Sequence, residues 1–159
     1  MAALHNKSGS AYLTIAGLSD TELERLRAAF ESADKVAVEG LAETPCVTLR
    51  NTDGRVSSRG VKVAFGYQFV ALQKFGPVAL AAVPASKRAD DALLSHLCGT
   101  RNCLVAAHIV IESKRTNDER THCHFCMSNI KQMAGALAVA IALDSGLCPH
   151  EPRCGSCDV

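Results

Sequence analysis

Residues 95–108 read SHLCGTRNCLVAAH, and this stretch decides how the chain is expected to fold. It brings Cys98, Cys103 and His108 within eleven residues, around a turn that can fold all three onto one ion. Thiolate and imidazole are the ligands that zinc prefers, and a tetrahedral site needs a fourth. Cys46 lies upstream and is the unclaimed candidate. The stretch therefore predicts a zinc site.

A second group of candidate ligands lies near the end of the chain, where Cys148, His150 and Cys154 follow one another. Cys123 is the expected fourth ligand of this group. An alternative is an all-cysteine site made of the two C-x2-C pairs that begin at Cys123 and Cys154, and spacing alone leaves both arrangements open. In either arrangement four protein ligands close the zinc ion, so the expected role is structural and the chemistry must lie elsewhere.

The composition supports metal sites. The chain has 159 residues, of which 4% are aromatic and none is Trp, so the core must be built from small aliphatic side chains. Eight Cys and six His are expected to supplement that thin core. No secretion signal opens the sequence, so we expect an intracellular protein in which cysteines bind metal. The longest apolar run, 133–143, is too short to span a bilayer, and no membrane partner is expected.

Charge is unevenly distributed along a chain whose net charge is only +1. Residues 20–43 contain seven acidic and three basic side chains, whereas residues 46–75 contain five basic and one acidic. A local basic stretch suits a surface that faces DNA, although a solvated hairpin explains the same pattern.

The pattern of apolar and polar residues predicts an α+β fold. Residues 1–10 are expected to form a flexible arm and residues 11–159 one domain. Arg55, Ser57 and Arg59 share one face of an expected strand. The expected elements are a helix after the capping box that begins at Ser19, a β-hairpin of residues 47–50 and 55–59, an apolar helix over 62–75, strands over 93–98 and 106–111, and helices over 113–121 and 128–144.

An ordered series of residues resembles the His-Cys box homing endonucleases, which belong to the His-Me finger, or ββα-metal, nucleases. The resemblance covers roughly residues 46–154, and Val105-Ala106 departs from it where the family has Asn-Pro. The matching residues are His96, Cys98, Cys103, His108, Asn117 and Cys123, followed by Cys148-Pro149-His150 and Cys154.

The resemblance implies a ββα-metal core over about 93–121, beside an antiparallel sheet and two structural zinc sites. It assigns the first zinc to Cys46, Cys98, Cys103 and His108, and the second to Cys123, Cys148, His150 and Cys154. It therefore favours the histidine-containing arrangement of the second site over the all-cysteine one.

The resemblance also implies catalytic roles. His96 would be the general base that deprotonates water, and Asn117 would hold a catalytic divalent cation, usually magnesium. Arg59 would contact the scissile phosphate, with Arg55 and Lys62 as rivals for that role. A neutral imidazole and a hard amide oxygen are groups that phosphodiester hydrolysis can use in these roles.

The partner that the resemblance implies is double-stranded DNA, which the family reads with an antiparallel sheet in the major groove. The residues in position to do so are Thr48, Arg50, Arg55, Ser57 and Lys62. The family further implies a homodimer, a nuclear location and a role in intron homing by site-specific double-strand breaks. Two alternatives are a zinc-scaffolded DNA-binding protein without cleavage activity and a related nuclease with loose sequence preference.

Overall fold

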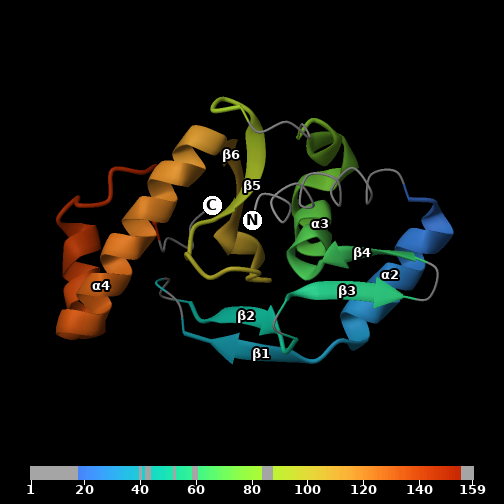
Figure 1. Cartoon of the computed structure of the whole chain (residues 1–159), viewed down its shortest axis with the longest axis horizontal. Helices are drawn as coiled ribbons and strands as arrows, with labels where there is room; N and C mark the ends of the chain where they lie inside the picture. Colours follow the sequence, from blue (N-terminus) through green and yellow to red (C-terminus); the bar gives the residue numbers. More distant parts are fainter. Residues whose placement is uncertain are drawn as a thin grey trace, which may run out of the picture.

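Over the residues that it describes, the computed structural model has an α+β fold of short antiparallel strands and three longer helices (Figure 1). It describes residues 18–39, 41, 44–51, 53–58, 61–83 and 88–154, with only the backbone described at 61–64. The expected arm at residues 1–10 lies outside these ranges. The elements are α2 (Asp20–Ser32), β1 (Lys35–Val38), β2 (Cys46–Leu49), β3 (Arg55–Ser58), β4 (Val61–Phe65), α3 (Gly66–Ala81), β5 (Ala92–His96), the 3-10 turn η1 (Ala106–His108), β6 (Ile109–Ser113) and α4 (Lys114–Asp144).

Helix α2 begins where the sequence predicts. The Ser19 side chain accepts a hydrogen bond from the Glu22 backbone N–H, and the Glu22 carboxylate accepts one from the Ser19 N–H, which completes the capping box. Leu26 and Phe30 are the buried side chains of α2. The Phe30 ring stacks on the Phe69 ring of α3, with the ring centroids 5.4 Å apart, so α2 packs against α3.

The strands near the middle of the chain pair differently from the expectation. Strand β2 pairs with β1, with Val38 opposite Cys46, and β3 pairs with β4, with Arg55 opposite Phe65. The predicted hairpin of 47–50 with 55–59 is therefore wrong, as is the predicted helix start at Lys62. Residues 61–65 read VKVAF, an alternating segment with two β-branched residues, which suits a strand better than a helix. Helix α3 begins only at Gly66.

Strands β5 and β6, with the turn η1 between them, form a hairpin that is followed by helix α4. Strands β5 and β6 pair antiparallel, with His96 opposite Ile109 and Ala92 opposite Ser113. The Ser113 side chain caps α4 by accepting a 3.1 Å hydrogen bond from the Thr116 N–H, as predicted.

The sequence predicts a helix that ends at Thr121, but helix α4 continues to Gly135, where a φ of 82° turns the backbone. Two helices are therefore joined at Gly135, not near residue 125. Because no Gly or Pro occurs between residues 114 and 134, nothing in the sequence ends the helix earlier. Figure 1 shows the two parts of α4 side by side at one end of the molecule.

Buried apolar side chains form one main core and two smaller groups made largely of cysteine. The main core lies between α2, α3 and the strands that cross them (Figure 1). One small group is wholly cysteine, and the other adds Met127, Val139 and Ala142 to three cysteines. The main core consists of Leu26, Phe30, Leu49, Val56, Phe69, Val70, Ala71, Leu80, Val83 and Ile109.

Within the described residues, α4 is the helix whose length and composition would allow it to cross a membrane, with a mean hydropathy of 1.3 over its most apolar 18 residues. Any such window with few charges includes the turn at Gly135. The same helix carries the fully buried Arg120, paired with Glu112. Only 17% of that apolar window is buried, however, and Met133, Leu137 and Ile141 are exposed.

Replacing Ser113 with Ala should lower the free energy of unfolding by about 1 kcal/mol, because the first turn of α4 loses its side-chain acceptor. Urea titration followed by circular dichroism measures the change. Ser113→Asn should retain most of the stability, since Asn also caps helices. Ser128→Ala, the same change inside α4, should cost nothing. Equal losses for the two Ala variants would contradict the capping role.

Candidate metal centres and catalytic residues

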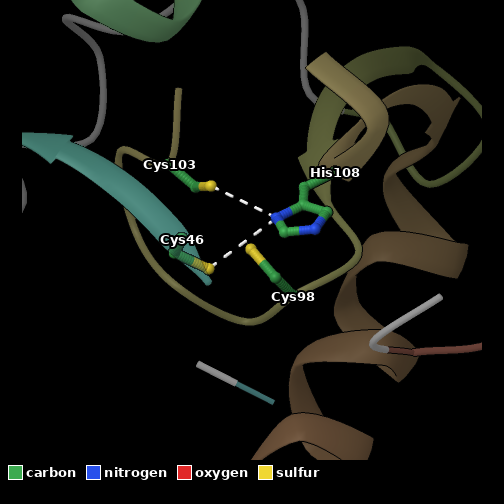
Figure 2. A group of neighbouring side chains, drawn as sticks. All are labelled: Cys46, Cys98, Cys103 and His108. Atoms are coloured by element: carbon green, nitrogen blue, oxygen red, sulfur yellow. Dashed lines mark hydrogen bonds between the residues drawn. The ribbon is translucent and has the colours of Figure 1, made fainter. Parts of the chain in front are cut away.

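The first cluster brings together Cys46, Cys98, Cys103 and His108, as the sequence predicts. Their ligand atoms all lie within 4.8 Å of one another, and no residue among the four is more than 1% exposed. Figure 2 shows the four side chains pointing toward a common centre, with Cys46 at the start of β2 and the others around the loop that follows β5. The cluster therefore joins β2 to the β5–β6 hairpin.

Backbone geometry holds that loop in place. Gly99 and Asn102 both have positive φ, 69° and 63°, which folds the chain back between Cys98 and Cys103. The Leu104 N–H donates to the Val47 carbonyl at 2.7 Å, so the loop is also hydrogen-bonded to β2. From the other side, the Lys74 ammonium of α3 donates to the carbonyls of Ala106 and Ile109 and fixes the turn that carries His108.

The donor atoms of the first cluster fit zinc. The His108 Nδ1 lies 3.4 Å from the Cys103 sulfur and 3.7 Å from the Cys46 sulfur. Two ligands of a tetrahedral zinc ion are expected about 3.5–3.8 Å apart, given the usual Zn–S and Zn–N lengths. Hydrogen bonds with Cys103 and Cys98 lower the pKa of Cys46, while hydrogen bonds with Cys103 and Cys46 raise the pKa of Cys98. A bound divalent cation would favour the thiolate form of all three cysteines.

The second cluster brings together Cys123, Cys148, His150 and Cys154, again with all ligand atoms within 4.8 Å. The His150 Nδ1 lies 3.5 Å from each of the Cys148 and Cys154 sulfurs, so this donor set also fits zinc. Cys123 projects from the middle of α4, and the other three lie in the segment that follows α4. Of the all-cysteine alternative, Cys126 is exposed and outside the cluster, and Cys157 lies outside the described residues.

The ligands of the second cluster also differ in the direction of their pKa shifts. Burial opposes ionisation of the Cys148 thiol, but backbone N–H groups of Cys154 and His150 donate to it and lower its pKa. Burial raises the pKa of Cys123 and lowers that of His150. A neutral imidazole is the form that binds a metal, so the histidine is ready to act as a ligand.

His96 ends strand β5, two residues before Cys98, and its ring is held from two directions. The His96 Nε2–H donates to the Cys103 carbonyl at 3.2 Å, which leaves Nδ1 with its lone pair. The edge of the ring meets Tyr67 of α3 at 5.0 Å. Burial lowers the pKa of His96 to about 4, so the imidazole is neutral near pH 7. The side chain is thus fixed and neutral, with a lone pair on Nδ1.

Asn117 lies in the first turn of α4 and is half-buried. Its side-chain oxygen is the hard donor type that magnesium accepts, so the residue type fits a cation ligand. His96 and Asn117 belong to the same unit of β5, β6 and α4. The third expected catalytic residue, Arg59, lies outside the described residues.

The expected DNA-reading residues occupy two separate sheets, because β2 and β3 are not paired. Thr48 is in β2, and Arg50 follows it with an ion pair to Asp34 at 2.5 Å. Arg55 and Ser57 lie in β3, on the face opposite the buried Val56. The Arg55 guanidinium lies over the Phe65 ring at 5.3 Å and near the Asp53 carboxylate. Lys62 lies in β4, but its side chain is not among those described.

Three residues that sequence reasoning missed hold these parts together. Tyr67 contacts His96, Arg120 contacts Glu112 and Cys154, and the His124 Nε2–H donates to the Leu97 carbonyl at 2.9 Å. Arg120 and His124 lie within three residues of Cys123, and that proximity was the only signal in the sequence. A side chain that packs between elements leaves no pattern of its own.

The family comparison agrees with this geometry. A family model described as the zinc-binding loop region of homing endonuclease matches residues 42–157, which is more than half of the chain. The matched range includes all eight residues of the two clusters. No curated protein and no solved structure matches the chain.

The purified protein should contain two zinc ions per chain. Cys46→Ser and Cys148→Ser should each remove one of them, because each loses a ligand of a different cluster. Cys126→Ser, which changes an exposed cysteine outside both clusters, should retain two. Native mass spectrometry counts the ions directly. Loss of an ion from Cys126→Ser together with retention in Cys148→Ser would instead support the all-cysteine arrangement.

Replacing Gly99 with Ala should destabilise the protein by about 1–3 kcal/mol, because φ is 69° at this position. A Cβ there would also lie 2.9 Å from the His124 ring, which packs against the loop from α4. Gly146→Ala is the matched control, since φ is 79° but nothing lies within 4 Å. Thermal unfolding of both variants should show the larger loss for Gly99→Ala. Equal losses would mean that the His124 contact contributes nothing.

Proposed function

Since the chain belongs to the homing endonuclease family whose zinc-binding loop region matches residues 42–157, we propose that it is a metal-dependent DNA endonuclease. It hydrolyses phosphodiester bonds at a specific site and makes a double-strand break. The family supports a nuclease. The proposed mechanism rests on the way in which the Cys103 carbonyl and Tyr67 hold the His96 ring. That arrangement is the observation that carries the mechanism.

His96 is the general base of the proposed reaction. A base must be neutral at the working pH and fixed toward the water that it deprotonates. The pKa of His96 is lowered by burial, and its ring is held by the Cys103 carbonyl and Tyr67. Its neighbour Leu97 donates its N–H to the His108 carbonyl at 2.8 Å, which ties the backbone at this point to the first metal cluster. The base would therefore be positioned by a metal centre that takes no part in the chemistry.

Asn117 is the proposed side-chain ligand of the catalytic cation, which we take to be magnesium. One amide oxygen from the protein leaves most coordination positions for water and phosphate oxygens, as magnesium prefers. A bound divalent cation supplies charge neutralisation at the phosphate and at the leaving 3′ oxygen. In this proposal β5, β6 and the start of α4 are the ββα-metal core, with His96 on the hairpin and Asn117 on the helix.

Substrate binding is proposed to fall on the strands that precede this core. Arg59 would contact the scissile phosphate, and Thr48, Arg50, Arg55, Ser57 and Lys62 would contact DNA. Strands β2, which carries Thr48, and β3, which carries Arg55 and Ser57, are joined through Gly54, whose Cα packs so closely on Asn102 that a Cβ would overlap its side chain. That contact connects the proposed DNA-binding strands to the loop of the first metal cluster.

Cleavage of both strands of a near-palindromic site requires two active sites, so we propose that the enzyme acts as a homodimer. A nuclear location and intron homing complete the proposal, and both rest on the family alone. Exposed apolar side chains in the second part of α4, at Leu137 and Ile141, are candidates for the dimer contact.

The enzyme should cut a DNA site selected from a random library when magnesium is present. His96→Ala should bind that site but cleave it about 10²–10⁴-fold more slowly, because the general base is lost. Asn117→Ala should also lose cleavage and respond less to magnesium. Single-turnover cleavage of labelled DNA, beside a binding assay, measures both effects.

His122→Ala is the matched control for this experiment, since His122 is an exposed histidine on α4 outside both clusters. It should cut at the wild-type rate. Wild-type protein that binds a site tightly and never nicks it would favour a DNA-binding protein without cleavage activity. Normal cleavage by His96→Ala would leave the nuclease class intact and overturn the proposed base.

A further inference from the structure

Arg120 is the largest side chain that is fully buried, and its guanidinium joins three segments of the chain. One edge meets the Glu112 carboxylate of β6, with Nη2 donating at 3.0 Å and Nε at 3.2 Å. The Nη1 group donates to the Pro152 carbonyl at 2.9 Å and to the Cys154 sulfur at 3.5 Å. A single cation therefore connects β6, α4 and the segment that carries the second metal cluster.

Stability alone is a poor explanation for this arrangement. Removing two charges from water costs several kcal/mol per ion, and a buried pair often contributes no more than a well-packed apolar pair would. Glu112 is nearly as buried as Arg120, with 10% of its side chain exposed. The pair is better explained by the precise geometry that a forked guanidinium imposes on its partners.

The sulfur contact gives Arg120 a role toward the metal. A cluster of three thiolates, one neutral imidazole and one Zn²⁺ carries a net charge of −1, so a cation that donates to Cys154 stabilises the loaded state. Residues that hold metal ligands in place commonly change metal affinity about 10–100-fold when they are replaced. Arg120 is in the position of such a residue.

The carboxylate contact gives Arg120 a role toward the proposed active site. Glu112 immediately precedes Ser113, the N-cap of α4, so the Arg120–Glu112 pair braces the corner where β6 turns into the helix. Asn117 lies within that braced segment, three residues before Arg120. The orientation of the first turn of α4 therefore depends on a side chain that also holds the second cluster.

We propose that Arg120 is a positioning residue that couples occupancy of the second metal cluster to the placement of Asn117. With metal bound, Cys154 holds the far edge of the guanidinium, and the near edge fixes the β6–α4 corner. The relevance to catalysis rests on the proposed function, because it assumes that Asn117 is the cation ligand. The coupling itself does not require that assumption.

The first test measures the metal without any DNA. In zinc-loaded protein, a chromogenic chelator should remove zinc from the second cluster about 10–100-fold faster in Arg120→Lys and Glu112→Gln than in the wild type. The His150 and His108 imidazole resonances distinguish the two clusters, and release from the first should not change. Arg115→Lys is the matched control, since Arg115 lies on the same helix as Arg120 but makes an exposed ion pair, with Asp90 ahead of β5. Wild-type release from all variants would overturn the proposal.

The second test measures the coupling. Removing zinc from the second cluster should shift the side-chain amide resonances of Asn117 in the wild type, and Glu112→Gln should reduce that shift. Glu112→Gln should also need more magnesium for half-maximal cleavage while binding DNA normally. An unchanged Asn117 shift would overturn the coupling, whether or not the protein cuts DNA. A protein with the expected shifts that never cuts DNA would contradict the proposed function and support the role of Arg120.

Discussion

The rest of the structure depends on two buried clusters of cysteine and histidine, which lie apart from the main apolar core and hold the segments outside it together. Binding of a structural zinc ion is worth about 10–16 kcal/mol in small zinc domains, which equals or exceeds the usual net stability of a domain. Without a metal, the thiols of each cluster ionise unequally: the hydrogen bond with Cys103 raises the pKa of Cys98 and burial raises that of Cys123, whereas the pKa values of Cys46 and Cys148 are lowered. A bound divalent cation would favour the thiolate form of all of them. Metal binding and folding are therefore expected to be one process in this protein.

The clusters also explain which parts of the fold the sequence predicts well. Ligand spacing predicts both groups of four, because cysteine and histidine at these short intervals are typical of zinc sites. Local signals predict the caps at Ser19 and Ser113, where one side chain satisfies one backbone group. These features need no knowledge of the rest of the chain.

What the sequence does not predict is pairing at a distance. Strand β1 is only four residues long, and nothing local indicates that Val38 lies opposite Cys46. The alternation of apolar and polar residues over 61–65 is too short to separate a strand from the start of the following helix. Only the pairing with β3 identifies it as a strand, so the sequence alone predicts a helix there. Tyr67 and Arg120 escaped notice because their roles arise from packing between elements. In the candidate site the identities of the ligands were predictable, and the residues that hold them were not.

Several basic side chains of residues 46–75 already have partners within the protein, which changes how this stretch could bind DNA. Lys74 is turned inward, toward two backbone carbonyls, and burial lowers its pKa. Arg50 and Arg55 each lie beside an acidic residue. A phosphate that approaches these arginines must therefore compete with a carboxylate, which favours binding where both groups are well placed and weakens indiscriminate binding.

Residues 128–147 leave the second cluster along α4, turn at Gly135 and return to Cys148. The metal site fastens both ends of this excursion, and Val139 and Ala142 pack beside the cluster, so its length is least constrained at the exposed turn at Gly135. Doubling a loop between fixed ends adds about 0.6 kcal/mol of closure entropy. The excursion can therefore grow or shrink during evolution, or accept an inserted peptide, while the coordination sphere stays intact. The short interval between Cys148 and Cys154 has no such freedom.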